Sequence, residues 1–215
     1  KLFCINGQKS SYIGTLGFYI NSKKFKDLNN TTPSYFEILN LLNLAYKKGV
    51  RFVFIEVSSI GYCEGRIGNL KYSHCILTNL KSDHLDYHGD IKNYHLSKLN
   101  LIKKHKLKNS ILFLQDDKLK YKFKYYKNKL CSQDNFLAKH KISINQTDFD
   151  NFQITTRNKC YNLKTFNDFM VENITTILMV YKKIINQYPL KFNNSLFPPG
   201  RSEIIYNRNN KVIII

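Results

Sequence analysis

The run Phe52-Val53-Phe54-Ile55-Glu56-Val57 is apolar at every position except Glu56 and is rich in β-branched and aromatic residues. A strand with such a continuous apolar sequence is typical of a parallel sheet covered on both faces. Similar apolar segments occur before and after it, at Ser11 to Ile20, Cys75 to Leu80 and Ser110 to Leu114. We therefore expect several buried strands in one sheet.

The segments between these strands have apolar residues at helical spacing. Thr32-Pro33-Ser34 offers a helix start, Tyr35 to Lys48 follows it as a helix, and Ile91 to His105 is a second helix. Strands that alternate with helices predict the α/β class, with a mostly parallel sheet flanked by helices.

The pattern changes after about residue 115. A small antiparallel addition is expected near residues 150–165, because Phe152 to Thr156 and Tyr161 to Leu163 flank a turn like the strands of a hairpin. The other elements expected here are a solvated helix over Asp116 to Leu130, a helix over Phe169 to Gln187, and two strands at Glu203 to Tyr206 and Lys211 to Ile215.

The composition is that of a globular protein. The chain has 215 residues, 43% of them hydrophobic, which fits one domain with a packed core. No run approaches the roughly 18 apolar residues of a membrane-spanning helix, and we expect no signal peptide, because the chain does not open with a charged segment followed by an apolar run and a cleavage site. We expect a soluble, cytoplasmic monomer without a membrane partner. The five cysteines are an odd number without zinc-site spacing, which favours reduced thiols.

The formal net charge is +19, from 34 Lys and Arg against 15 Asp and Glu. A surplus of this size is typical of proteins that bind phosphate-rich partners. However, the sequence is also rich in Lys, Asn, Ile, Tyr and Phe and has no Trp, as A+T-rich codons alone would produce. We expect that nucleic acid is not a partner, and keep a basic nucleic-acid-binding module as an alternative.

The densest group of chemically capable residues is Thr78-Asn79-Leu80-Lys81-Ser82-Asp83-His84-Leu85-Asp86-Tyr87-His88-Gly89, directly after a predicted strand. Ligands of open parallel sheets bind beyond the carboxyl ends of the strands. The Asp and His side chains could bind a metal, polarise water or cap the next helix. The residues alone leave these possibilities open.

Two further groups lie at predicted strand or helix ends. In Glu56-Val57-Ser58-Ser59-Ile60-Gly61, a carboxylate ends an apolar run, where it is costly unless it is paired or binds a cation. The residues Asn30-Thr31-Thr32-Pro33 lie in a loop that leads into a predicted helix. The N-terminus of a helix favours anions, although Thr32 could simply be the helix cap.

Taken together, these motifs resemble those of the Mur ligase family, in particular the branch that adds the third amino acid to a UDP-N-acetylmuramoyl dipeptide. The order and approximate spacing match over essentially the whole chain, and the Asp-His-Leu-Asp-Tyr-His-Gly string is the most specific part. The motifs that carry the resemblance are Gly14-Thr15-Leu16-Gly17, Asn30-Thr31-Thr32-Pro33, Glu56-Val57-Ser58-Ser59, Arg66, Thr78 to Gly89, Tyr94 with Lys98, and Gly200-Arg201-Ser202-Glu203.

The resemblance implies an ATP-dependent amide-bond ligase of peptidoglycan precursor synthesis. Its substrates would be UDP-N-acetylmuramoyl-L-Ala-D-Glu, ATP and an amino acid, either diaminopimelate or lysine, with Mg²⁺ as cofactor. The matching positions imply Mg²⁺ ligands at Glu56, His84 and a carbamylated Lys98, with Lys98 and His84 as catalytic residues; muramoyl-substrate contacts at Asn30, Thr31, Thr32, Ser58 and Arg66; and nucleotide contacts at Asn173 and Arg201.

Lys98 also has a simpler interpretation. Tyr94 and Lys98 are four residues apart on a helix with other lysines, so they could form an ordinary solvated pair. Only the resemblance favours a modified lysine.

The chain departs from the family pattern at two places. Glu64 stands where the branch often has Gln, and a carboxylate there would repel an anionic substrate unless it turns away. The family's Gly-x-Phe-Asn-Val-x-Asn pattern appears here as Asn167-Asp168-Phe169-Met170-Val171-Glu172-Asn173. The second change affects expected nucleotide contacts.

The sequence contains no phosphate-binding loop of the form G-x-x-x-x-G-K-[ST]. We expect residues 1–215 to be the central ligase domain without that loop on its N-terminal side and without the C-terminal amino-acid-binding domain, and therefore to be inactive alone. The alternatives are a sibling ligase, such as a folylpolyglutamate synthetase or another Mur branch, and a catalytically silent relic.

Overall fold

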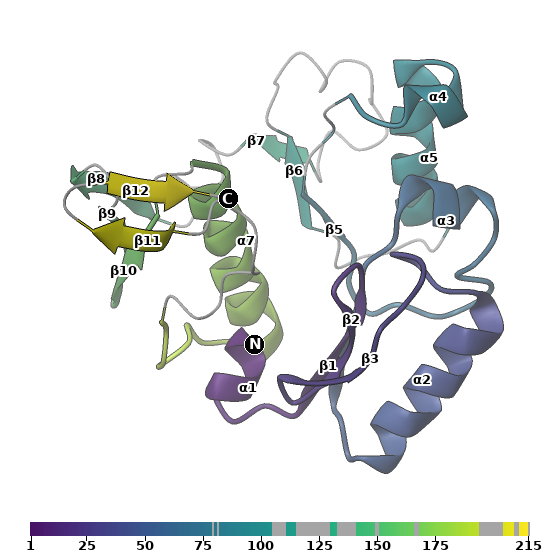
Figure 1. Cartoon of the computed structure of the whole chain (residues 1–215), viewed down its shortest axis with the longest axis horizontal. Helices are drawn as coiled ribbons and strands as arrows, with labels where there is room; N and C mark the ends of the chain where they lie inside the picture. Colours follow the sequence, from purple (N-terminus) through teal and green to yellow (C-terminus); the bar gives the residue numbers. More distant parts are fainter. Residues whose placement is uncertain are drawn as a thin grey trace. The chain divides into compact units, whose positions relative to one another are not determined.

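A computed structural model describes residues 1–78, 80, 82–104, 111–114, 130–132, 141–148, 151–165, 168–193, 204–208 and 211–214 (Figure 1). The chain divides into two compact units. The first consists of Lys1, Phe3 and Gly7–Gln133, and the second of Leu2, Cys4–Asn6 and Asp134–Ile215. The short helix α1, Leu2–Ile5, has residues in both units.

The first sheet of the first unit contains β1 (Ser10–Gly14), β2 (Gly17–Ile20), β3 (Lys23–Lys26) and β4 (Phe52–Ile55), in the order β3-β2-β1-β4. The β1 and β4 strands are parallel, whereas β1, β2 and β3 form an antiparallel meander. The single strand expected over Ser11 to Ile20 is therefore wrong. The chain reverses between Gly14 and Gly17, and Gly17 has a φ of +105°, which side chains other than glycine rarely tolerate.

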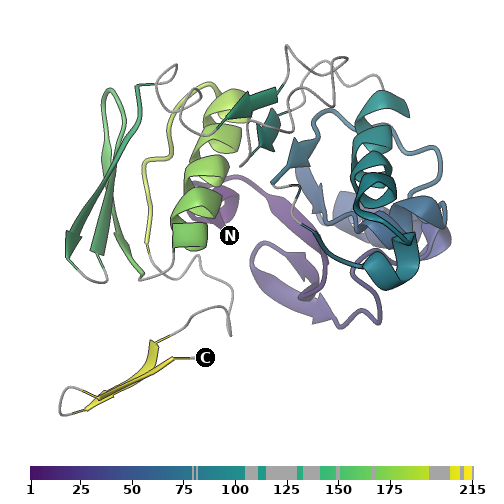
Figure 2. The same ribbon diagram turned by 90° about the horizontal axis from the view of Figure 1, so that it is seen from above.

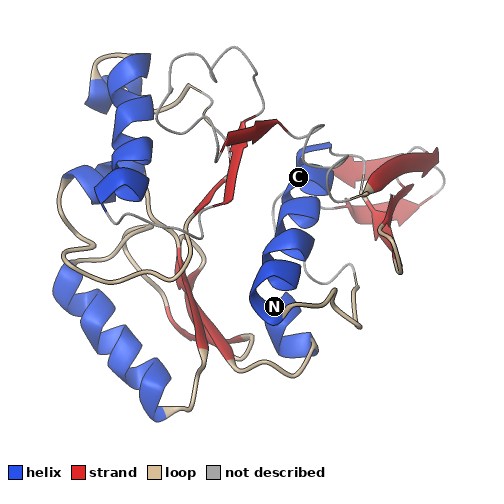
Figure 3. Cartoon of the chain, turned by 180° about the vertical axis from the view of Figure 1, so that it is seen from behind, coloured by secondary structure: helices blue, strands red, loops and turns tan. Residues whose placement is uncertain are grey.

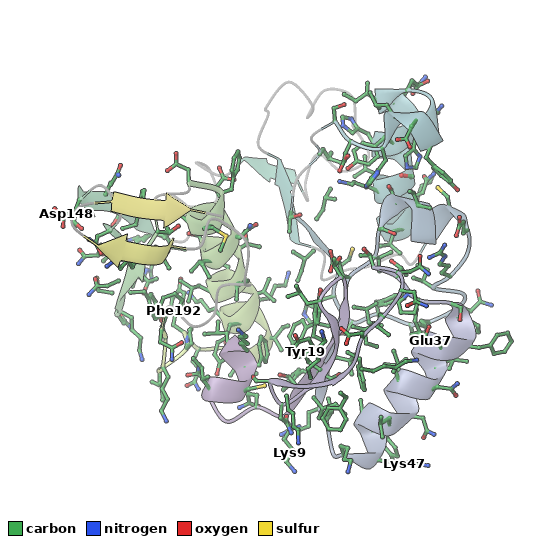
Figure 4. The ribbon with its side chains drawn as sticks, in the orientation of Figure 1. Lys9, Tyr19, Glu37, Lys47, Asp148 and Phe192 are labelled. Carbon is green, nitrogen blue, oxygen red and sulfur yellow. The ribbon has the colours of Figure 1, made fainter. Side chains whose placement is uncertain are left out.

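Helix α2 (Tyr35–Lys47) packs on this sheet as its periodicity predicts. Ser34 caps it, since its side chain accepts a hydrogen bond from Glu37 N at 3.3 Å; Thr32 is not the cap. Glu37 and Lys47 mark the two ends of the helix in Figure 4. The core between helix and sheet consists of Ile13, Phe18, Ile20, Leu41 and Ala45.

The opposite face of β4 is also covered. The Phe3 ring contacts the rings of Phe52 and Phe54, with centroid distances of 5.2 and 4.8 Å. Ile55 packs against the α2 core instead, as the alternation of side chains along a strand requires. These contacts leave Phe52, Phe54 and Ile55 half-buried, whereas Val53 remains exposed.

The rest of the first unit contains a second, fully parallel sheet in the order β5-β6-β7, visible in Figure 2. The prediction of parallel strands flanked by helices is confirmed, but the described strands of the first unit form two sheets, the first of them largely antiparallel. The elements are α3 (Ser59–Cys63), β5 (Ile76–Leu77), α4 (Leu85–His88), α5 (Ile91–Lys104), β6 (Ile111–Leu114) and β7 (Leu130–Ser132).

The second unit contains the expected antiparallel addition, drawn in red in Figure 3. The hairpin of β9 (Asn151–Thr155) and β10 (Cys160–Lys164) is confirmed, and β8 (Ser143–Asp148) adds a third strand. Helix α7 (Asp168–Ile185) and the hairpin of β11 (Ile204–Arg208) and β12 (Lys211–Ile214) also match their predictions. The helix expected over Asp116 to Leu130 lies outside the described residues, apart from Leu130 in β7.

Within the described ranges, no helix has the length and hydropathy needed to span a membrane. Cys4, Cys63, Cys75 and Cys160 are free thiols. Burial raises the pKa of the Cys75 thiol to about 11.

Candidate functional site

The candidate site lies where the parallel strands β1 and β4 end. Ile13 pairs with Ile55 in the ladder, and Glu56 N donates to Ile13 O at 2.8 Å. Both strands point the same way, so the residues that follow them, Thr15 and Glu56, meet at one edge of the sheet. This is the edge at which parallel sheets bind ligands.

The exposed Glu56 carboxylate accepts three hydrogen bonds from residues that the structure describes. Tyr12 Oη donates to Oε2 at 2.5 Å, and Thr15 N donates to the same oxygen at 3.0 Å. Thr15 Oγ1 donates to Oε1 at 3.1 Å. Because the carboxylate is exposed, these bonds fix its orientation rather than offset a cost of burial.

The same contacts determine which hydroxyl group is the donor in the hydrogen bond between Thr15 and Thr31. Thr15 Oγ1 has one proton, which it donates to Glu56, so the 2.9 Å contact between Thr15 Oγ1 and Thr31 Oγ1 has Thr31 as donor. Thr31 is then left with acceptor lone pairs. Thr31, expected from the sequence as a substrate contact, thus lies beside Glu56.

Thr32 connects this region to the loop that precedes α3. Its hydroxyl donates to Glu56 O at 3.1 Å and accepts from Ser58 N at 2.9 Å, and the residue is fully buried. Ser58 Oγ caps α3 by accepting from Gly61 N at 3.0 Å. Gly61 is glycine for steric reasons, because a Cβ there would lie 2.6 Å from Thr32 Cβ.

Arg66 completes this group from the turn after α3. Its Nη1 donates to Thr32 O at 3.0 Å, while Nε donates to Glu64 Oε2 at 2.6 Å. Glu64 therefore turns toward Arg66 and forms an ion pair with it. A hollow of about 410 Å³ opens beside this turn and is lined by Tyr35, Tyr62, Cys63, Gly65, Ile67, Gly68 and Asn69.

A second group of residues surrounds the buried ring of Tyr94 on α5. His84 lies edge-on to this ring at a centroid distance of 6.5 Å, and Lys98 Nζ lies 4.4 Å from the ring centroid. Two of the three expected metal ligands therefore flank one aromatic ring. His84 has a left-handed backbone, with a φ of +50°, and its backbone N–H donates to Asp83 Oδ1 at 2.9 Å.

Lys98 is half-buried on α5, and burial lowers the pKa of its ammonium group, while the nearby charge of Asp83 acts in the opposite direction. A lowered pKa increases the fraction of neutral amine at a given pH. Burial also raises the pKa of Tyr94, with a smaller contribution from Asp83. These shifts do not fit the interpretation of Tyr94 and Lys98 as a fully solvated pair.

His88 joins the two groups. Its Nε2 lies 3.0 Å from Ser59 Oγ on α3, and its ring lies 5.3 Å from that of Tyr94. The loop that carries Ser58 and the helix that carries Lys98 are thus connected through one histidine.

The remaining expected site residues lie elsewhere. Asn30 is exposed in the loop before α2. Asn173 is exposed in the second turn of α7, in the second unit. Arg201 lies outside the described residues.

Sequence reasoning did not assign site roles to Tyr12, Thr15, Ser59 and His88. Thr15, Ser59 and His88 are in or beside the quoted motifs, and their spacing could have suggested a role. Tyr12 is separated from Glu56 by 44 residues, and only the register of β1 on β4 brings the two together.

Comparisons with known proteins agree with this geometry. Residues 4–186 match the family described as the Mur ligase middle domain. A UDP-N-acetylmuramoyl-L-alanyl-D-glutamate--2,6-diaminopimelate ligase from Buchnera aphidicola is 40% identical over 112 residues, covering 51% of this chain and 22% of the relative. A UDP-N-acetylmuramyl-tripeptide synthetase 2 from Oceanobacillus iheyensis is 30% identical over 233 residues, covering 98% of this chain and 46% of the relative.

A solved structure has the same fold. The structure of a UDP-N-acetylmuramoyl-L-alanyl-D-glutamate--2,6-diaminopimelate ligase matches with a TM-score of 0.72 and 21% identity, over 99% of this chain and 46% of the other. The chain thus spans less than half the length of each of these proteins.

Proposed function

The chain belongs to the Mur ligase family, as the middle domain, and from this premise we propose that it is part of an ATP-dependent ligase of peptidoglycan precursor synthesis. The ligase joins diaminopimelate or lysine to UDP-N-acetylmuramoyl-L-Ala-D-Glu. The observation that carries the proposal is the group of Thr31, Glu56 and Ser58 at one strand edge, which hydrogen bonds link through Thr15 and Thr32. The names of the relatives at 30% and 40% identity support this branch of the family.

The proposed reaction has two steps. A substrate carboxylate oxygen attacks the γ-phosphorus of ATP, which gives an acyl phosphate and ADP. The amine of the incoming amino acid then attacks the acyl carbon, loses a proton, and displaces inorganic phosphate as the amide forms. Both steps involve negatively charged groups, so the polar side chains near the strand edge and the cationic Arg66 after α3 have the chemistry that the reaction needs.

Glu56, His84 and Lys98 are the residues that we propose to hold Mg²⁺. When bound, Mg²⁺ neutralises charge on phosphate oxygens. Within the described residues, no group of three or more His, Cys, Asp or Glu side chains is arranged to hold a metal ion. One carboxylate such as Glu56 nevertheless fits Mg²⁺, which proteins commonly hold through one or two carboxylates together with substrate phosphates.

Lys98 fits this set only if it becomes anionic. The neutral amine attacks the carbon of CO₂ and releases one proton, which leaves a carbamate with a negative charge. The lowered pKa of Lys98 supports this step, because only the neutral amine is nucleophilic.

The residues proposed to contact the substrate lie in the loop before α2 and in the segments on either side of α3. Asn30, Thr31 and Ser58 offer polar groups to the muramoyl peptide, and Arg66 offers a positive charge to its carboxylates. Thr32 acts indirectly, since its buried hydroxyl holds Ser58 and its carbonyl holds Arg66. Asn173 and Arg201 are proposed to contact the nucleotide. ATP and a UDP-linked acceptor are cytoplasmic metabolites, which supports action in the cytoplasm.

The test is a ligation assay on the protein purified from its own cells. With ATP, Mg²⁺ and UDP-N-acetylmuramoyl-L-Ala-D-Glu, radiolabelled diaminopimelate or lysine should enter the UDP-linked product. Lys98→Ala should abolish ligation, and Lys98→Glu, which restores a shorter carboxylate, should retain part of it. Incorporation of glutamate into a folate instead would favour a folylpolyglutamate synthetase, and no ligation of any kind would favour a silent relic.

A further inference from the structure

We propose that Tyr12 is a positioning residue that holds the Glu56 carboxylate so that one lone pair, on Oε1, remains for a cation. The inference rests on the proposed role of Glu56 as a metal ligand and adds to it the atom that binds and the side chain that selects this atom.

The strand register brings Tyr12 to Glu56. Tyr12 pairs with Phe54 across the parallel ladder of β1 and β4. Because side chains alternate along a strand, Phe54 and Glu56 leave the sheet on the same face as Tyr12. The long phenol side chain extends from the level of Phe54 along β4 to that of Glu56. Its hydroxyl lies 2.5 Å from Glu56 Oε2.

A count of hydrogen bonds shows what remains free on the carboxylate. A carboxylate offers about four lone-pair positions, two on each oxygen. On Oε2, Tyr12 Oη and Thr15 N use both; on Oε1, Thr15 Oγ1 uses one. Counting the hydrogen bonds from described residues alone, one position on Oε1 is left, so these contacts arrange the carboxylate to bind a cation through a single oxygen.

Close packing protects the bond between Tyr12 and Glu56. A Cβ added at Gly14 would collide with both the Tyr12 hydroxyl and Glu56 Oε2. The backbone of Gly14 therefore lies directly against this pair. A cation that approaches Oε2 would have to displace the phenol, whereas Oε1 needs no such rearrangement.

Removal of the Tyr12 hydroxyl should therefore weaken cation binding. Partners that orient a ligating side chain typically change metal affinity by roughly 10- to 100-fold when they are removed. For Tyr12→Phe we expect the metal affinity to fall by about tenfold, the low end of this range, because the two hydrogen bonds from Thr15 to Glu56 remain. If the phenol instead competed with the metal, its removal would strengthen binding.

The experiment measures Mn²⁺ binding to the 215-residue chain. Mn²⁺ has the same preference for carboxylate oxygen as Mg²⁺, and it broadens the NMR signals of nearby nuclei. The titration follows the backbone amides of Thr15 and Glu56 in wild type, Tyr12→Phe, Tyr19→Phe and Glu56→Gln. Tyr19 pairs with Tyr12 across β1 and β2 and is labelled in Figure 4, so Tyr19→Phe removes the same atom from a neighbouring ring.

The inference predicts that Tyr12→Phe needs about ten times more Mn²⁺ than wild type for equal broadening, that Tyr19→Phe matches wild type, and that Glu56→Gln shows almost none. Equal or tighter binding by Tyr12→Phe, alongside a loss in Glu56→Gln, would overturn the role of Tyr12 and leave the proposed function intact. Wild-type broadening that persists in Glu56→Gln, or that is absent from wild type, would overturn the metal role of Glu56 and the inference together. Thermal unfolding of each variant shows whether the fold is retained.

Discussion

The guanidinium group of Arg66 is bound at the same time by Glu64 and by the Thr32 carbonyl. Nε donates to Glu64 Oε2 at 2.6 Å, and Nη1 donates to Thr32 O at 3.0 Å. Arg66 is the residue proposed to attract substrate carboxylates, so Glu64 occupies the place that such a carboxylate would take.

Glu64→Gln should consequently strengthen binding of UDP-N-acetylmuramoyl-L-Ala-D-Glu to the chain. The gain should be about two- to fivefold, because a partly exposed ion pair is worth at most roughly 1 kcal/mol. Isothermal titration calorimetry measures it. Glu37→Gln, which breaks the ion pair of Glu37 with Lys26 on another part of the unit, is the control and should leave affinity unchanged. An unchanged affinity in Glu64→Gln would show that Glu64 does not compete with substrate.

Gly61→Ala should destabilise the first unit. The added methyl carbon would lie 2.6 Å from Thr32 Cβ and 3.0 Å from Ser58 Oγ, where a real contact needs more room. Overpacking of this kind costs about 1–3 kcal/mol of unfolding free energy. Urea denaturation followed by circular dichroism measures the loss, and a midpoint equal to that of wild type would contradict the packing described at Thr32.

Lys98 should form a carbamate in bicarbonate buffer more readily than other lysines of α5. Burial lowers the pKa of Lys98, so its neutral amine forms at lower pH than that of a solvated lysine. The carbamate should be lost when the pH falls below the pKa of Lys98, because the amine is then protonated. ¹³C NMR in labelled bicarbonate gives the signal. Lys98→Ala should remove it, and Lys92→Ala, at an exposed position of the same helix, should not. A signal that survives in Lys98→Ala would place the carbamate elsewhere.

The elements that the sequence predicts best are those whose pattern has one physical cause. Helices α2 and α7 bury apolar residues at helical spacing, and their periodicity follows directly from that burial, while the strand at Phe52 is recognisable from its continuous apolar run although its residues are at most half-buried. Strand β8 was missed because its residues are largely exposed, and so they carry no apolar signal. The turn between β1 and β2 does have a sequence signal, Gly14 and Gly17, but the apolar residues on both sides of it masked that signal.

The site was predictable only in part, for a related reason. Glu56 and Ser58 became candidates because they follow a recognisable strand, and Thr31 because it precedes a recognisable helix start. The contacts that orient them depend on register and on tertiary packing. Tyr12 meets Glu56 across 44 residues, through a strand register that local sequence does not encode, and Arg66 reaches the Thr32 carbonyl across 34 residues.

The most direct test of the account is where the muramoyl peptide binds. The backbone NMR signals of the isotope-labelled chain are followed during titration with UDP-N-acetylmuramoyl-L-Ala-D-Glu, and with the L-Ala-L-Glu diastereomer as control. The account predicts saturable shifts at Thr31, Ser58 and Arg66 with the D-Glu compound and weaker binding of the diastereomer. Saturable shifts confined to other residues, or no shifts at millimolar ligand, would contradict it.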